Sequence, residues 1–246
     1  MAIFHLSIKT VSRSRGQSTV ITAAYQSGEK LYDERAGLTR CYSHKERIEG
    51  TRIILPMFAP KWGLNREKLW NAAEAAEKRK DACVGREILV ALPAELSPHQ
   101  REELVFDFVG EIVSHIECAA DLAIHAPDKR GDQRNFHAHI LLSTRIFGPT
   151  GFGKKTRELD VRHTASPILL QWRELWANLT NNALEQAGHE ARVDHRSLAE
   201  RGIDRIPGIH LGPGAIGFER RTGQPSRRRL DYEKAISEQR GTPHKS

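Results

Sequence analysis

The chain has 246 residues, a formal net charge of +7 and a hydrophobic content of 39%. This length fits one large domain, or a domain with a tail, and the apolar content is sufficient for a buried core. Because no run of about 18 apolar residues occurs and the opening residues lack the regions of a secretory signal, neither a membrane-spanning helix nor an exported protein is expected.

The basic excess favours a polyanionic partner. Nucleic acid is preferred over a membrane, because no basic amphipathic helix stands out. Residues 1–28 carry Lys9, Arg13 and Arg15 and no acidic residue. The three cysteines are scattered and form no CxxC motif, which favours a reduced, cytoplasmic environment.

Strands and helices alternate in the first half of the chain. Residues 4–11 alternate apolar and polar side chains, which predicts a half-buried strand, and a basic turn follows it. A helix is predicted over residues 17–32, where small residues surround Tyr25 and leave its ring accessible to a bulky substrate; simple packing of Tyr25 is the alternative. The remaining predicted elements are a loop (33–45), a strand (48–55), a helix (65–80) and a strand (86–92).

The second half opens with a helix at Ser97-Pro98, where an N-cap residue precedes a proline at the first helical position. Two strands are predicted next, over residues 121–126 and 136–142, joined by a polar loop. After an excursion over residues 144–164, Ser166-Pro167 predicts another helix start and Gly188 its end. Residues 221–246 are predicted to form a basic, mobile tail, and residues 1–220 the domain.

Three histidines lie on the two predicted strands, His125 on the first and His137 and His139 on the second. Side chains alternate faces along a strand, so His137 and His139 point the same way. If the strands pair, three imidazoles converge on one face, and three imidazoles are a donor set for a divalent metal. An ordinary hydrogen-bonded role is the alternative for each histidine taken alone.

The order of the elements predicts an α+β fold. We expect a mostly antiparallel central sheet, with helices packed on one face and the histidines on the other. Residues 148–156 (GPTGFGKKT) nearly match a P-loop, but Lys155 stands where the Mg²⁺-binding hydroxyl belongs. This segment is interpreted as a basic hairpin tip, and Lys154 and Lys155 join Lys9, Arg13 and Arg15 as candidates for contact with DNA phosphates.

Histidines, tyrosine and basic surface together fit phosphodiester chemistry. A metal on three neutral ligands retains its charge and open coordination positions, so it would bind a phosphate oxygen. An activated tyrosine would then attack phosphorus, release a 3′-hydroxyl and keep the 5′-phosphate as an ester. Imidazole ligands favour Mn²⁺, Zn²⁺, Ni²⁺ or Co²⁺ over Mg²⁺, and we expect Mn²⁺ or Mg²⁺ in use.

The sequence resembles the N-terminal relaxase domain of the MobA/MobL (MobQ-type) plasmid mobilisation proteins, within the HUH endonuclease superfamily. The similarity begins with the opening MAIFHL, continues through GQS to Tyr25, and includes the segments Arg86-Glu87-Ile88, His125, His137-Ala138-His139 and His210-Leu211-Gly212. It covers roughly residues 1–220.

This resemblance implies a relaxase that nicks one strand of single-stranded DNA at a plasmid's origin of transfer, in the bacterial cytoplasm. Tyr25 would be the nucleophile, with Tyr32 and Tyr42 as fallbacks, and the three histidines would be the metal ligands. Glu87 would accept a proton or orient a ligand; an ordinary strand-edge carboxylate is its alternative. Accessory proteins of the relaxosome and a coupling protein are the further partners implied.

One departure from the family pattern lies before the histidine pair, where Asn135-Phe136 stands in place of the Asn-Pro of many relatives. Many relatives also continue into a long C-terminal region. The predicted chemistry alone is also compatible with other functions: a rolling-circle replication initiator, a single-strand transposase, or a metal-stabilised DNA-binding module without catalysis.

Overall fold

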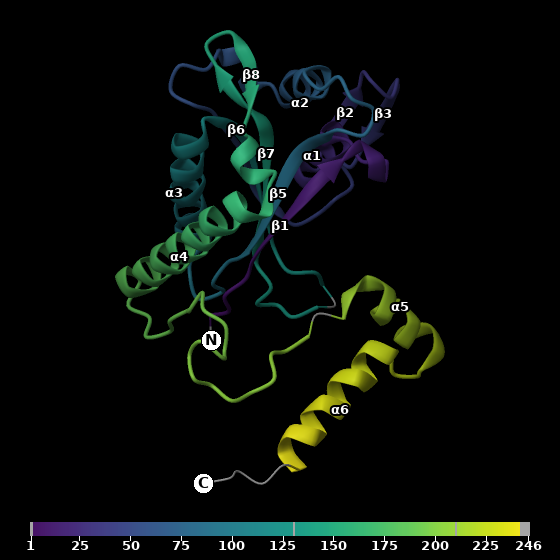
Figure 1. Ribbon diagram of the computed structural model, residues 1–246, viewed down its shortest axis with the longest axis vertical. Helices are drawn as coiled ribbons and strands as arrows, with labels where there is room; N and C mark the ends of the chain where they lie inside the picture. The colour runs from purple at the N-terminus through teal and green to yellow at the C-terminus, as the bar shows by residue number, and fades with distance from the viewer. Residues whose placement is uncertain (1, 130, 210, 242–246) are drawn as a thin grey trace. The chain divides into compact units, whose positions relative to one another are not determined.

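The computed structural model describes residues 2–129, 131–209 and 211–241. The chain divides into two compact units, Met1–His195 and Arg196–Ser246. All of the predicted site residues belong to the first unit, which contains the central sheet and helices α1 to α4 (Figure 1).

A six-stranded sheet forms the centre of the first unit, in the order β1-β5-β7-β6-β4, with β8 paired to β7. The strand pairs are antiparallel, as predicted. Because β7 lies between β5 and β6, its histidines stand on the central strand of the sheet. The strands are β1 (Leu6–Ser12), β4 (Ile48–Ile54), β5 (Cys83–Ala91), β6 (Cys118–His125), β7 (His137–Gly148) and β8 (Gly151–Lys155).

Helices α3 (Pro98–Ile116) and α4 (Arg162–Gln186) cover one face of the sheet (Figure 1). The alternate residues of β7 that face away from the histidines, such as Ile140, are fully buried in the hydrophobic core on this side. Ser97 and Gln100 form a capping box that begins α3, and Pro98 occupies its first turn. This face therefore forms as its sequence pattern predicts.

Helices α1 (Thr19–Ser27) and α2 (Arg66–Ala75) pack on the opposite, histidine-bearing face, which the sequence pattern left uncovered. The reason lies in β7, whose histidine face continues beyond the histidines with apolar Leu141 and Phe147. These two residues join α1 and α2 in a second hydrophobic cluster. The histidines thus lie at one end of this face of the sheet, and the other end of the face is buried in the second hydrophobic cluster.

Buried ion pairs fix α1 and α2 in place. Glu74 on α2 is 1% exposed, and its carboxylate accepts hydrogen bonds from Arg13 and from the backbone N–H and hydroxyl of Thr19 at the start of α1. Asp121 on β6 accepts hydrogen bonds from Arg66 and from the indole of Trp70, both on α2. The two helices are consequently tied to each other and to the sheet.

Several elements differ in their bounds from those predicted. The helix expected over residues 17–32 ends at Ser27, because Gly28 has a φ of 70° and closes it. A β-carbon at Gly28 would also lie 2.5 Å from Ile48 Cδ1, so the turn requires glycine. A hairpin follows, formed by β2 (Lys30–Asp33) and β3 (Leu38–Cys41), and α4 begins before Pro167 rather than at it. Short 3-10 helices are η1 (Arg13–Arg15), η2 (Lys61–Leu64) and η3 (Arg157–Leu159).

The second unit contains α5 (Gly212–Thr222) and α6 (Arg227–Gly241). The sequence pattern predicts neither helix, and α6 occupies most of the segment expected to be a mobile tail. Residue His210 of the closing motif and residues 242–246 lie outside the described residues. The predicted domain limit at residue 220 stays a prediction. In the part of the chain that the structure describes, no helix has the length and apolarity needed to cross a bilayer.

Replacing Glu74 by alanine should destabilise the protein by about 3–5 kcal/mol, because Arg13 would keep its buried charge without a counterion. The free energy of unfolding in urea measures this. Glu102→Ala is the matched control, because Glu102 pairs with Arg52 at 3.5 Å on the surface and is 47% exposed. Equal effects of the two substitutions would show that the Glu74 network is not a structural requirement.

Candidate active site

Strands β6 and β7 bring the three histidines to one place on the sheet. His125 lies directly opposite His137, and His139 lies two residues further along β7, opposite Ala123. The ring centroids are 5.4 Å apart for His125 and His137, 4.8 Å for His125 and His139, and 5.3 Å for His137 and His139. One nitrogen from each ring lies within 4.8 Å of the others. The predicted convergence of the imidazoles is therefore confirmed.

Each imidazole is oriented by an oxygen atom. His137 Nδ1 donates to the carbonyl of Asn135 at 2.9 Å, and His139 Nδ1 donates to Glu87 Oε1 at 2.8 Å. His125 Nε2 donates to the carbonyl of Gln26 at 2.7 Å. Because a carbonyl or carboxylate oxygen only accepts, each ring keeps its second nitrogen as a lone-pair donor. Metal-binding histidines are held in this way, so the three rings fit a divalent metal.

Burial keeps two of these imidazoles in their neutral form. Desolvation lowers the pKa of His125 to about 4; repulsion from His139 and Lys45 adds to this, while the Gln26 carbonyl opposes it. Desolvation also lowers the pKa of His137. The pKa of Glu87 is lowered chiefly by the hydrogen bond from His139. At neutral pH, His125 and His137 are therefore ready to act as ligands, beside an ionised carboxylate.

Glu87 and Gln26 connect the histidines to neighbouring elements. The β5–β7 pairing puts Leu89 opposite His139, so Glu87, two residues from Leu89, shares the histidine face. Glu87 Oε1 accepts a second hydrogen bond from Gln26 Nε2 at 2.9 Å. Gln26 thus contacts Glu87 with its side chain and His125 with its carbonyl. The sequence pattern misses Gln26, whose single clue is its place next to Tyr25.

Tyr25 stands in the last turn of α1 and is 49% exposed. Its neighbour Gln26 is in contact with two members of the histidine centre, so α1 brings the backbone of Tyr25 near that centre. The ring of Tyr42 meets the Tyr25 ring edge-on at 5.4 Å between centroids, and Lys45 Nζ lies 3.6 Å from the Tyr25 centroid. The fallback residue Tyr32 is on β2, where its backbone N–H donates to Glu67.

The unusual Asn135-Phe136 pair is explained by packing. Arg101 on α3 is 3% exposed, and its guanidinium carbon lies 3.8 Å from the centroid of the Phe136 ring. The carbonyl of Phe136 accepts a hydrogen bond from Leu92 N at 2.9 Å. Phe136 thus anchors the start of β7, and the carbonyl of Asn135 stays in reach of His137.

Two of the five predicted DNA contacts are corrected. The guanidinium of Arg13 is bound by Glu74 and by the carbonyls of Glu77 and Arg79, so it is a structural group. Lys155 Nζ lies 3.4 Å from Glu77 and donates to Cys83 O, and its side chain is 16% exposed. Both are paired inside the protein, which removes them from the candidates.

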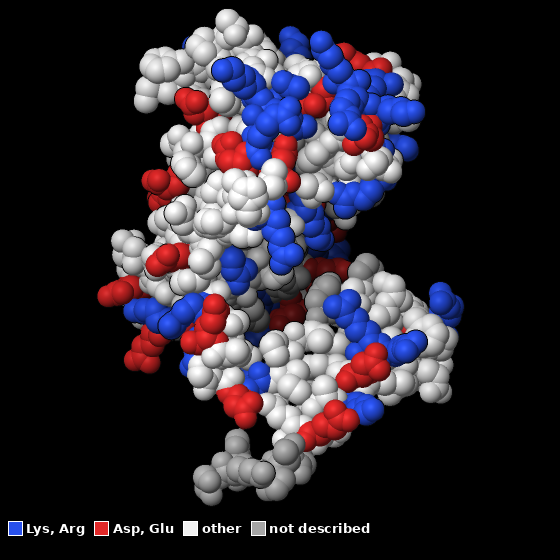
Figure 2. Space-filling model, viewed as in Figure 1, with Lys and Arg blue, Asp and Glu red and all other residues white. Residues whose placement is uncertain are grey.

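Lys9, Arg15 and Lys154 are exposed, as contacts with phosphate require. In Figure 2, basic side chains gather over the region that carries β8 and α2 in Figure 1. Lys78, Arg79 and Lys80, which follow α2 directly, are also exposed and were not among the predicted DNA contacts. This basic surface suits a polyanion.

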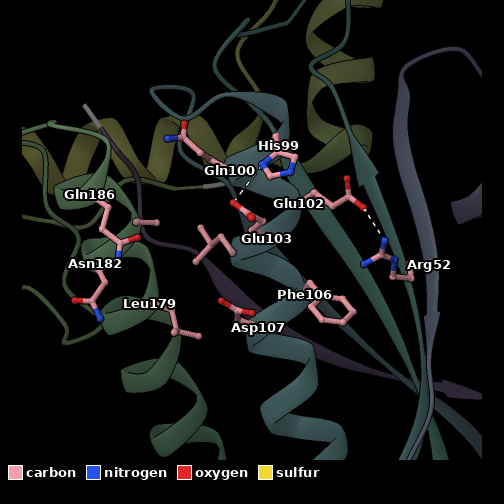
Figure 3. Close-up of a pocket in the computed structure, with 12 residues that line it drawn as sticks. Arg52, His99, Gln100, Glu102, Glu103, Phe106, Asp107, Leu179, Asn182 and Gln186 are labelled. Atoms are coloured by element: carbon pink, nitrogen blue, oxygen red, sulfur yellow. Dashed lines mark ion pairs between the residues drawn. The ribbon is translucent and has the colours of Figure 1, made fainter.

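A cavity of about 700 Å³ lies on the other face of the sheet, between α3 and α4. Figure 3 shows the carboxylates of Glu102, Glu103 and Asp107 along its wall, with Arg52 paired to Glu102. The carboxylates would repel a phosphodiester, and the histidines face away from this side. The cavity is therefore separate from the candidate active site.

Comparison with known proteins identifies the family of the chain. Residues 17–221 match the model of the MobA/MobL family. Mobilization protein MobL of Acidithiobacillus ferridurans is 42% identical over 97% of this chain and 69% of its own length. A probable mobilization protein MobA of Bifidobacterium longum is 34% identical over 92% of this chain, which spans 46% of that relative.

A solved structure has the same fold. One chain from a study of the molecular basis of vancomycin resistance transfer in Staphylococcus aureus superposes with a TM-score of 0.68 and 30% sequence identity. The match covers 80% of this chain and 100% of that chain.

Without metal, the protein should lose thermal stability as the pH falls from about 6.5 towards 4. In the unfolded chain His125 binds a proton near its ordinary pKa of 6.5, whereas in the folded chain its pKa is about 4. Between these pH values the unfolded state binds more protons, so a falling pH favours unfolding. The stability contributed by neutral His125 is present above pH 6.5 and lost below it. Melting curves between pH 7.5 and 4 should show a steeper decline for wild type than for His125→Gln; parallel declines would contradict this.

Proposed function

The chain belongs to the MobA/MobL family, and from this we propose that it is a conjugative DNA relaxase that nicks single-stranded DNA at an origin of transfer. The observation that carries the proposal is the junction of Gln26 with His125 and Glu87, because it sets the helix of Tyr25 against three converging imidazoles. This junction supports a site in which the nucleophile and the metal ligands come from separate elements.

His125, His137 and His139 would hold the metal. A bound divalent cation offsets the negative charge of the scissile phosphate and stabilises the charge that develops in the transition state. Mn²⁺ or Mg²⁺ would serve in the cell; all-nitrogen ligation favours Mn²⁺ and later transition metals over Mg²⁺ in binding. Neutral imidazoles at His125 and His137 leave that charge undiminished.

Tyr25 would attack the scissile phosphorus with its phenolic oxygen. A bond forms between this oxygen and phosphorus, and the bond from phosphorus to the 3′-oxygen breaks. The phenol loses its proton and the departing 3′-oxygen gains one, so the products are a free 3′-hydroxyl and a 5′-phosphotyrosyl ester. Because one phosphodiester replaces another, the reaction can reverse and religate the DNA.

Glu87 would orient His139 rather than act as the general base. Its Oε1 accepts hydrogen bonds from both His139 and Gln26, and its pKa is lowered. An ionised carboxylate that holds an imidazole N–H fixes the tautomer and direction of that ligand. Lys9, Arg15 and Lys154 would contact DNA phosphates. Relaxosome accessory proteins and a coupling protein are the partners that transfer would require, and the bacterial cytoplasm is the expected location.

Incubation with Mn²⁺ and labelled single-stranded oligonucleotides that tile the DNA around the gene should give a covalent adduct that survives denaturant. Tyr25→Phe should abolish the adduct, because phenylalanine offers no oxygen. Tyr32→Phe is the matched control, since Tyr32 is comparably exposed at 44%. An adduct that persists in Tyr25→Phe would reject Tyr25 as the nucleophile, and binding without any adduct would favour a non-catalytic module.

His137→Ala should lower the nicking rate to the level of wild type in EDTA, because two imidazoles do not hold the metal. Most of the DNA affinity at fixed salt concentration should remain, since contacts with phosphates supply it. His99→Ala on α3, where the side chain is 79% exposed, is the control and should nick normally. Equal nicking by metal-free and metal-loaded wild type would remove the metal from the proposal.

A further inference from the structure

The segment between β3 and β4, residues 42–47, lies against Tyr25. Its Tyr42 meets the Tyr25 ring edge-on, with 5.4 Å between centroids at an interplanar angle of 88°. Lys45 Nζ lies over the face of the same ring, 3.6 Å from the centroid, and donates a hydrogen bond to the Tyr25 carbonyl at 3.0 Å. One short segment thus contacts the Tyr25 ring with both an aromatic ring and an ammonium group.

Lys45 presents its charge to neutral groups. Among the described residues, no carboxylate lies within ion-pair distance of Lys45 Nζ, whose partners are the Tyr25 carbonyl and ring. An ammonium ion over an aromatic face is attracted by the ring's quadrupole, and the attraction grows when the ion is partly buried. Lys45 is partly buried. The contact therefore favours one orientation of a tyrosine that is otherwise half exposed on the last turn of its helix.

The same segment continues into the histidine centre. The carbonyl of Arg47 accepts a hydrogen bond from Ala126 N at 2.8 Å, and Ile48 pairs with His125 in the sheet. Lys45 N also donates to Tyr42 O at 2.8 Å, which closes the segment into a turn. The segment thereby connects the Tyr25 ring to β6, the strand that carries His125, while Gln26 connects α1 to His125 directly.

We propose that Lys45 is a positioning residue that, together with Tyr42, fixes the Tyr25 ring beside the histidines in the orientation needed for attack on phosphorus. This inference rests on the proposed nicking reaction. A nucleophile held in a near-attack geometry avoids the entropic cost of finding it, and a misplacement of about 1 Å can cost on the order of 100-fold in rate. Lys45 acts through Tyr25 and need not touch the DNA.

Lys45→Met, which removes the charge and keeps the length, tests this. The single-turnover cleavage rate constant with saturating protein should fall roughly 10- to 100-fold. The Kd for the same oligonucleotide, measured in a Tyr25→Phe background, should change less than about threefold, because one charge is a small part of the phosphate contacts. Lys45→Arg should recover most of the rate, since guanidinium also stacks on aromatic rings.

Lys129→Met is the matched control. Lys129 is 67% exposed and pairs with Glu46, which follows Lys45 in the same segment. Because Lys129 pairs with Glu46 and not with Tyr25, its loss should leave the rate unchanged and should separate the contact of Lys45 with the ring from a general loss of charge at this segment. If Lys45→Met unfolds, Tyr42→Leu replaces it and should slow cleavage at unchanged Kd. A wild-type rate in Lys45→Met, or equal losses of rate and affinity, would overturn the role of Lys45. Absence of any adduct in wild type would instead reject the nicking reaction itself.

Discussion

The register between β6 and β7 sets His125 opposite His137, and the site depends on it. A slip of one residue would turn His137 and His139 to the face covered by α3 and α4 and replace them with Ala138 and Ile140. The alternation of β7 prevents that slip, because its even-numbered residues from Ala138 to Leu142 are fully buried in the main core. Hydrophobic burial on one face therefore specifies the chemistry on the other.

The polar groups around the imidazoles make the centre ready for a metal before one binds. Each ring already donates one N–H to an oxygen, which fixes its orientation before a metal binds. Gln26 connects the histidine centre to α1, because it contacts Glu87 and His125 from the helix that carries Tyr25. Glu74 and Asp121, buried under α1 and α2, keep that helix against the sheet.

The histidine strands, the antiparallel sheet and helix α3 follow from local patterns: alternation, a capping box and a polar connecting loop. What the sequence does not reveal depends on contacts far apart in the chain. The role of Gln26 depends on its contact with His125 on β6, which the local sequence does not indicate. Arg13 has the sequence context of a phosphate ligand, but Glu74, 61 residues away, binds it. Gly28 is a sequence signal for the end of α1. The packing of α1 and α2 on the histidine face has no such signal, because apolar residues such as Leu141 and Phe147 occur on either face of a sheet.

In the proposed active site, one metal ion is held by three imidazoles within reach of the Tyr25 hydroxyl. A crystal structure of the protein grown with Mn²⁺, with anomalous data, locates the ion directly. The expected result is a single strong peak bound by one nitrogen each of His125, His137 and His139, with its open coordination side toward Tyr25. A peak elsewhere on the protein, or one bound by fewer than three of these histidines with Tyr25 turned away, would contradict the claim.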